Sequence, residues 1–220
     1  MMNPVYGESA PVPYAPTFGS YPVDVQFPVT ETANRLWAIP VVGYYAKLII
    51  LIPHLLILTV LEIVCYFLQY VMWIPVLFTG QYPAWGHTLY GGTVSWRMRF
   101  FAFMFGLTDA YPAFSLSDPG TGREAVILFQ PPVRYNRLYA VPILGAVIRT
   151  VLLIPHLLTL WLYSMVVGFS QLFLWIPVLL TGKYPQSARD TVGGYLRYTT
   201  RLYMYSLGLT DKYPPFRLGS

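Results

Sequence analysis

The chain repeats itself at an interval of 102 residues, and this repeat constrains the fold more than any other feature of the sequence. Residues 34–118 align without a gap to residues 136–220, with 36 identities in 85 positions. Asn-Arg, Pro-His, Gly-Gly and Thr-Asp pairs recur at matched places. Duplication explains such a pattern, so we expect two copies of one unit, over residues 21–118 and 119–220. The Pro-, Gly- and Ser-rich residues 1–20 are predicted to form a disordered tail.

Composition indicates a membrane protein. The chain is 55% hydrophobic and only 10% charged, whereas soluble domains carry about 25% charged residues. A bilayer accepts the apolar exterior that so few charges leave. The net charge of +5 comes from cations scattered among aromatic residues. Anionic lipid headgroups therefore fit this charge better than a nucleic acid does.

Each copy contains an apolar run too long for a single membrane crossing. Residues 36–79 are almost unbroken in apolarity, and one crossing needs about 20 residues. Pro53-His54 is the best break, because proline removes a backbone donor and disturbs the preceding turn. The pattern predicts a transmembrane or re-entrant helical hairpin with its tip at this pair. Pro155-His156 would form the tip of a second hairpin.

A third segment of each copy is predicted to be an amphipathic helix lying in the membrane interface. In the second copy Arg189, Gly193, Arg197 and Arg201 recur every four residues, which places them on one helical stripe. Glycine favours close helix contact. Helix packing is therefore expected at four glycines: Gly91, Gly92, Gly193 and Gly194.

Short strands and the arrangement of the copies complete the predicted fold. Alternating residues 23–27 and the matched run 124–133 predict strands, and the Tyr-Pro-x-Phe-x-Leu tails are expected to join them. The predicted class is an α-helical integral membrane protein with two tandem parallel repeats and short β-strands at the cytoplasmic face. Hairpins would leave most cations on the side of the termini, so the positive-inside tendency places both termini in the cytoplasm.

Three residues inside the apolar segments are candidates for ion or proton handling or for partner contact: Glu62, His54 and His156. An ionised carboxylate within a membrane is expensive, so Glu62 would be protonated or paired. Its match in the second copy is Ser164, so the duplicated unit does not require it. The histidines either satisfy carbonyls freed by the prolines or act as ligands or proton carriers. Both alternatives remain open for all three residues.

Several cations are predicted to contact lipid headgroups. Lys47 and Arg149 occupy matched positions six residues before each proline, within snorkelling reach of an interface. Asn34 and Asn136 are predicted helix N-caps, each followed by an arginine that could hold a lipid phosphate. The set of headgroup contacts comprises Arg35, Arg137, Lys47, Arg149, Arg97, Arg99, Arg197 and Arg201.

No nucleophile–base pair, phosphate-binding loop or metal-spaced cluster occurs in the sequence, so we expect no enzyme activity, no cofactor and no metal site. The repeated motif, above all "WIPVLxTGxYP" at 73–83 and 175–185, resembles a bacterial family of membrane domains known only as a domain of unknown function. That resemblance implies a multi-pass protein of the bacterial inner membrane.

The predicted function is that of a non-enzymatic accessory or scaffold subunit of a larger membrane assembly. Other membrane subunits, or further copies of the chain, are the expected partners. The alternative is a small oligomeric transporter or channel for an ion or lipid.

Overall fold

A computed structural model of the chain describes residues 21–28, 32–117, 120 and 122–219. The predicted tail, residues 1–20, lies outside the described residues. Both repeats contain the same succession of strand, 3-10 helix, long helix and shorter helix. The elements are β1 (Val23–Gln26), η1 (Arg35–Ala38), α1 (Val42–Thr79), α2 (Ala84–Met104), β2 (Val126–Phe129), η2 (Arg137–Ala140), α3 (Leu144–Thr181) and α4 (Gln186–Ser206).

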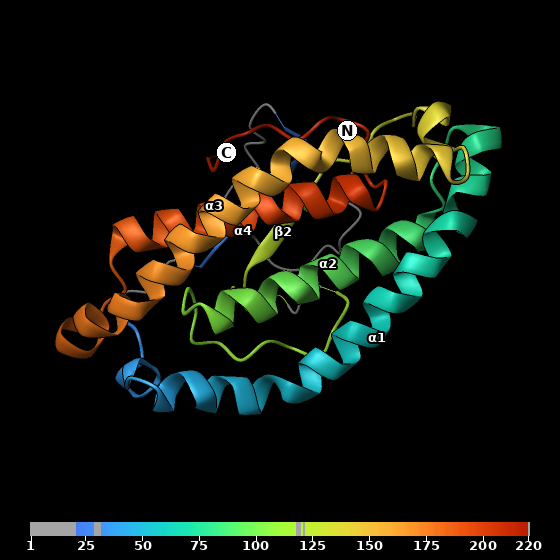
Figure 1. The fold of residues 1–220 in the computed structure, drawn as a ribbon. Helices are drawn as coiled ribbons and strands as arrows, with labels where there is room; N and C mark the ends of the chain where they lie inside the picture. Colours follow the sequence, from blue (N-terminus) through green and yellow to red (C-terminus); the bar gives the residue numbers. More distant parts are fainter. Residues whose placement is uncertain (1–20, 29–31, 118–119, 121, 220) are drawn as a thin grey trace.

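The prediction of a hairpin at each Pro-His pair is wrong. Helices α1 and α3 each run unbroken for 38 residues, with Pro53 and Pro155 inside them. Figure 1 shows both helices bending along their length instead of turning back. An interior proline loses one helical hydrogen bond and kinks the helix, but it need not end it when the freed groups find other partners. Pro53 and Pro155 free the carbonyls of Ile49 and Val151, four residues earlier. At the next carbonyls, those of Ile50 and Leu152, the hydroxyls of Tyr111 and Tyr213 donate hydrogen bonds, each at 3.0 Å.

A strained backbone joint begins each long helix. Val41 and Ile143 have φ angles of 65° and 64°, and the following N–H groups bond back to the carbonyls of Pro40 and Pro142 at 2.6 and 2.7 Å. These are γ-turns of the rare, positive-φ form. They turn the chain sharply from the 3-10 helix into the long helix, and they recur in both repeats.

The four helices form a layered bundle, with α2 and α4 lying between α1 and α3 (Figure 1). Helix α1 packs on α2, helix α3 packs on α4, and the two shorter helices contact each other. Strand β1 packs on α4 and β2 on α2. The long helices are thus separated from the small sheet by the two shorter helices.

The two repeats cap each other's long helix. At Gly182, where α3 ends, the carbonyl accepts a hydrogen bond from the N–H of Ala33 at 2.7 Å. At Gly80, where α1 ends, the carbonyl accepts one from Tyr135 at 3.0 Å. The last carbonyls of a helix have no partner within the helix. Each repeat therefore satisfies a helix end that belongs to the other, and neither repeat is complete alone.

Strands β1 and β2 form an antiparallel pair, with Val23 opposite Phe129 and Gln26 opposite Val126. The side chains of Val23, Val25 and Phe129 are buried in the core shared by both repeats. The Tyr-Pro-x-Phe-x-Leu tails, expected to join this sheet, form no strand within the described residues. They pack instead over the glycines of α2 and α4.

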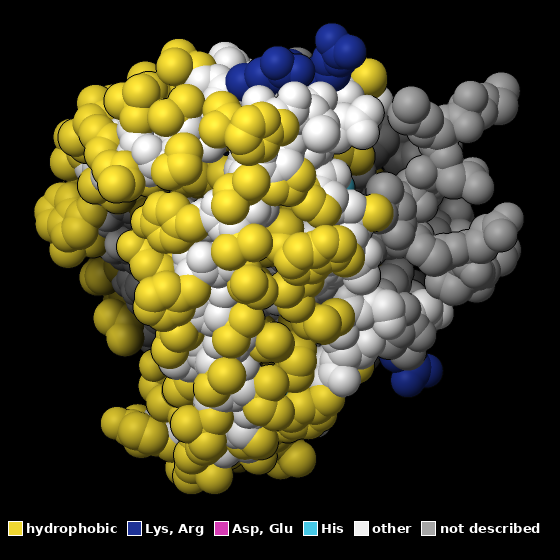
Figure 2. All heavy atoms as spheres, turned by 90° about the vertical axis from the view of Figure 1, so that its right-hand side faces the viewer, with side chains coloured by type: hydrophobic (Ala, Val, Ile, Leu, Met, Phe, Trp, Pro, Cys, Tyr) yellow, Lys and Arg dark blue, Asp and Glu magenta, His cyan; other side chains and the backbone are white. Residues whose placement is uncertain are grey.

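The outward faces of α1 and α3 are apolar. Of the 45 large hydrophobic side chains that are exposed in the described part of the chain, 17 lie on α1 and 17 on α3. Figure 2 looks at the molecule from the end of α1 and the start of α3. It shows a nearly continuous apolar surface with basic side chains only at its edges. Both helices are also long and apolar enough to cross a membrane.

Candidate functional site

Each Pro-His histidine is enclosed by aromatic rings from its own repeat. His54 is fully buried, stacks on Phe114 with ring centroids 3.8 Å apart, and accepts a hydrogen bond at Nδ1 from Trp96 Nε1 at 2.9 Å. His156 is also fully buried and stacks on Phe216 at 3.9 Å. The recurring Tyr-Pro-x-Phe tail thus folds back over the recurring Pro-His pair.

The environment of His54 favours a structural role. Because Nδ1 accepts the indole N–H, the ring is neutral and carries its proton on Nε2. In the second repeat the Tyr198 hydroxyl lies 2.6 Å from His156 Nδ1. Within the described residues, no group of three or more His, Cys, Asp or Glu side chains is placed to hold a metal ion. The ring stacking packs each histidine against the tail of its own repeat.

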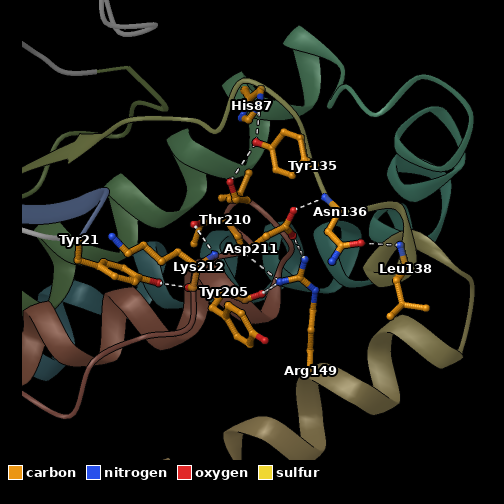
Figure 3. Close-up of polar contacts among 11 residues, drawn as sticks. Tyr21, His87, Tyr135, Asn136, Leu138, Arg149, Tyr205, Thr210, Asp211 and Lys212 are labelled. Atoms are coloured by element: carbon orange, nitrogen blue, oxygen red, sulfur yellow. Dashed lines mark hydrogen bonds and ion pairs between the residues drawn. The ribbon is translucent and has the colours of Figure 1, made fainter.

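The cation six residues before the second Pro-His pair, Arg149, points into the protein. Arg149 is 3% exposed, and its Nη1 donates to the carbonyls of Tyr205 at 2.7 Å and Thr210 at 3.0 Å. Its Nη2 forms an ion pair with Asp211 (Figure 3). One guanidinium therefore ties α3 to the end of α4 and to the Thr-Asp turn behind it.

Lys47 makes a smaller version of the same contact. It is 6% exposed, and Nζ donates to the carbonyl of Phe103 at 3.0 Å. The ammonium also lies 5.1 Å from the centre of the Phe103 ring, within range of a cation–π interaction. Charge is common to both copies, but the planar fork of the arginine spreads its donors over two carbonyls and a carboxylate, whereas the compact ammonium of Lys47 bonds one carbonyl.

The Thr-Asp turns close each repeat on its own beginning. Asp109 accepts a hydrogen bond from the N–H of Asn34 at 2.6 Å, and Asp211 accepts one from Asn136 (Figure 3). The two asparagines accept from Leu36 and Leu138 two residues later, each at 3.0 Å. The predicted N-cap role of both asparagines is confirmed, although the helix that they cap is a 3-10 helix.

Glu62 is paired, and it does not meet the histidines. Its Oε1 lies 2.8 Å from Nη1 of Arg97 on α2, and both side chains are about one-third exposed. Arg97 also stacks over the ring of Tyr203 on α4, 4.7 Å from its centre. The matched positions are Ser164 and Thr199, so this ion pair distinguishes the first repeat from the second.

A cavity of about 490 Å³ lies beside Glu62, between α1, the start of α3 and the end of α4. Its wall includes Glu62, Gln69 and Tyr70 from α1 and Ala146 and Arg149 from α3. A second cavity of about 370 Å³ occupies the opposite junction, where α1 begins and α3 ends. Several of its wall residues match those of the first after a shift of 102 residues, among them Tyr44, Lys47 and Gln171.

Four of the predicted headgroup contacts are corrected because their side chains are buried and bonded within the protein. Besides Lys47 and Arg149, Arg99 is 2% exposed and pairs with Glu124 at 3.0 Å, and Arg201 is 1% exposed and donates to the carbonyl of Gly219 at 2.8 Å. Arg97 and Arg197 are partly exposed and paired, the latter with Asp24 at 3.1 Å. Arg35 and Arg137 are exposed.

The paired glycines provide close approach to extended segments of the chain. A Cβ atom on Gly92 would lie 2.6 Å from the carbonyl oxygen of Leu116, and one on Gly194 would lie 2.8 Å from the Cβ of Leu218. On Gly193 the nearest atom belongs to Phe27, at 3.2 Å. The three contacts therefore correct the expected helix packing: these glycines make room for the tails and for the residue that follows strand β1. Gly91 is buried in α2.

Sequence reasoning missed the tyrosines and phenylalanines that clasp the Pro-His pairs: Tyr111, Phe114, Tyr213 and Phe216. Their recurrence alongside Pro-His was the available signal. It also missed Gln69 and the pairing of Arg97 with Glu62, for which a comparison of the two copies was the available signal. Gln69 recurs as Gln171, whereas Arg97 and Glu62 are both lost in the second copy.

His87 on α2 makes folding sensitive to acid. Its Nε2 donates to the Tyr135 hydroxyl at 3.1 Å, and that hydroxyl donates to the carbonyl of Leu209 (Figure 3). Burial lowers the pKa of His87 to about 4, against about 6.5 in the unfolded chain. Between pH 6.5 and pH 4, His87 is therefore protonated in the unfolded chain but stays neutral in the folded chain. Stability should therefore fall by up to about 3 kcal/mol between pH 6.5 and 4.

Denaturant unfolding at pH 7 and pH 4.5 measures this loss. His87→Gln keeps a donor near Tyr135 but cannot titrate, so it should be less stable than wild type at pH 7 and lose less stability on acidification. An equal loss of stability in the variant and in wild type would contradict the assignment to His87.

Comparison with known families gives one match. A family model described as a domain of unknown function (DUF4389) matches the chain twice, at residues 43–115 and 144–217. Comparison with curated proteins and with solved structures gives no significant match. The two matched segments cover the long and short helices of both repeats and their tails.

Proposed function

We propose that this chain, which belongs to the family described as domain of unknown function DUF4389, is a non-enzymatic membrane scaffold. It acts as an accessory subunit of a larger assembly in the bacterial inner membrane. The observation that carries the proposal is the broad apolar surface formed by the outward faces of α1 and α3. Monomeric soluble proteins rarely expose apolar patches larger than a few hundred Å².

The polar groups of the long helices support insertion of these outward faces into lipid. Lys47 and Arg149 point inward to backbone carbonyls, and Glu62 pairs with an arginine of α2. Lipid-facing surfaces exclude unpaired charges for energetic reasons. At about 1.5 Å per residue each long helix is roughly 57 Å long, nearly twice the thickness of a bilayer core of about 30 Å. Strong tilt or an in-plane position fits this length.

The distribution of cations supports an orientation. Of the 14 Lys and Arg residues, only Lys47 and Arg149 lie within α1 or α3. The other 12 belong to the shorter helices, the loops, the tails and the region of the sheet. The positive-inside tendency therefore favours an orientation in which these elements, together with both termini, lie at the cytoplasmic surface. This arrangement replaces the four crossings expected from two hairpins.

Membrane fractionation tests the proposal. We expect the full chain to stay in the membrane pellet after alkaline carbonate washing and to float with liposomes after reconstitution. Leu56 and Leu158 occupy matched positions and are 63% and 64% exposed. Replacing both with lysine should abolish flotation, because each buried lysine costs about 2.5–3.5 kcal/mol at the centre of a membrane helix.

Val133→Lys provides the matched control. Val133 is 79% exposed and lies outside the long helices, so this variant should float like wild type. A wild-type chain that stays in solution without detergent, or a double variant that still floats, would overturn the membrane role.

Purification in mild detergent separates a scaffold from a transporter. A scaffold subunit should co-purify with membrane proteins in fixed stoichiometry, or with further copies of itself, and should carry no ion flux in liposomes. Flux that Glu62→Gln abolishes would support the transporter in place of the scaffold.

A further inference from the structure

We infer that the cavity between α1, α3 and α4 is a binding site for one glycerolipid, held through an uncharged ester or hydroxyl group by the side-chain amide of Gln69. This inference rests on the membrane location proposed above. The cavity volume of about 490 Å³ falls within the range of about 300–1,000 Å³ that is typical of small-molecule sites.

The entrance of the cavity lies on the apolar surface. Three residues of its wall, Ile63, Tyr66 and Phe67, are 52%, 56% and 66% exposed on the outward side of α1. A ligand that enters past these side chains comes from the lipid phase. The wall is mostly apolar and aromatic, as expected for a site that surrounds acyl chains close to their polar end.

Gln69 is the polar group of the cavity that is free to bind a ligand. Its side chain is only 7% exposed and lines the cavity, and no hydrogen bond joins it to any other described residue. The donors and the acceptor of this amide are therefore available to a ligand in the cavity. In the second repeat, Gln171 donates to the hydroxyl of Tyr184 at 3.3 Å. The residue that matches Tyr184 is Tyr82, which packs against His87 and Tyr135 instead.

The charges around the cavity favour an uncharged group. Glu62 is neutralised by Arg97, and Arg149 by Asp211. The hydroxyls of Thr59 and Ser206 already donate to backbone carbonyls of their own helices, at 2.7 and 2.8 Å. An ester carbonyl can accept from the Gln69 amide, and a glycerol hydroxyl can donate to it.

Comparison of the two copies supports a site in the first junction only. Ala146 on the α3 wall corresponds to Tyr44 in the wall of the second cavity. The first cavity thus has open space where the second has a phenol ring. One bound lipid per chain is therefore expected, not two.

Native mass spectrometry of the full chain in detergent tests the inference, with dioleoylglycerol and dioleoylphosphatidylglycerol as probes. We expect one dioleoylglycerol per chain, weakened about tenfold by Gln69→Leu, because one neutral hydrogen bond contributes up to about 1.5 kcal/mol. Ala146→Tyr should abolish binding, since it introduces the ring found at the matched position. Gln171→Leu is the control and should bind like wild type.

Flotation with liposomes and the unfolding midpoint are measured on the same four proteins, so that loss of binding is read only from folded, membrane-associated chains. Wild-type protein that floats but binds no dioleoylglycerol, or binds it equally after Gln69→Leu and Ala146→Tyr, would overturn the site and leave the membrane role intact. Tighter binding of the anionic probe would overturn the assignment to an uncharged group. Failure of wild type to float would overturn the membrane role itself.

Discussion

Replacing Arg149 with methionine is expected to lower the free energy of unfolding by about 3–5 kcal/mol, because it leaves the Asp211 carboxylate without its partner in a mostly buried site. The same change removes the donors that serve the carbonyls of Tyr205 and Thr210. Three segments then lose their common attachment: α3, the end of α4 and the Thr-Asp turn.

The first repeat supplies the matched comparison. Lys47 donates to the carbonyl of Phe103 alone, so Lys47→Met should destabilise less than Arg149→Met does. Arg149→Lys keeps the charge but loses the forked geometry. Its loss of stability should be smaller than that of Arg149→Met and larger than that of Lys47→Met. Denaturant unfolding of the purified protein, followed by tryptophan fluorescence, gives all three values. A loss below about 1 kcal/mol for Arg149→Met would show that this arginine does not hold the segments together.

The sequence predicted the duplication and the helical content because both depend on local pattern. The 102-residue match is visible without any knowledge of contacts, and the family match at residues 43–115 and 144–217 is consistent with it. The four-residue spacing of Arg189, Gly193, Arg197 and Arg201 lies within a real helix, α4. Its polar stripe, however, faces the first strand and the chain's last residues, since Arg197 and Arg201 donate to the carbonyls of Val25 and Val23.

Proline in an apolar run does not by itself predict a hairpin, because its effect on a helix depends on contacts outside its own segment. Proline does remove a helical hydrogen bond, but each helix continues past it, and a tyrosine 61 residues away donates its hydroxyl to the carbonyl next to the one that proline frees. For the same reason the inward position of Lys47 and Arg149 cannot be read from the sequence: their acceptors are mainly backbone carbonyls 56 and 61 residues distant, and a backbone carbonyl is present at every residue. Contacts of this kind become predictable only when two recurring motifs are recognised as partners.

Gly145→Ala is expected to cause the second large loss of stability. A Cβ atom at this position would lie 2.1 Å from the carbonyl oxygen of Tyr139, and one at Gly43 would lie 2.3 Å from that of Trp37. Both obstacles are backbone atoms at the γ-turn joint, so no side-chain rotation relieves the clash. Because overpacking a tight site typically costs about 1–3 kcal/mol and sometimes more, we expect at least about 3 kcal/mol for each variant.

Gly168→Ala is the control for this experiment because it lies in the same helix, α3, with nothing within 4 Å of the added Cβ. Alanine should stabilise that position by about 0.5–1 kcal/mol through its higher helix propensity. The two substitutions in one helix should therefore change the unfolding midpoint in opposite directions. If Gly145→Ala were neutral, the added Cβ atom would have to lie farther than 2.1 Å from the carbonyl oxygen of Tyr139. The start of α3 would then not be held tightly against the 3-10 helix, and the strained φ of Ile143 would have no explanation. Agreement between Gly43→Ala and Gly145→Ala would show that both copies depend on the same joint.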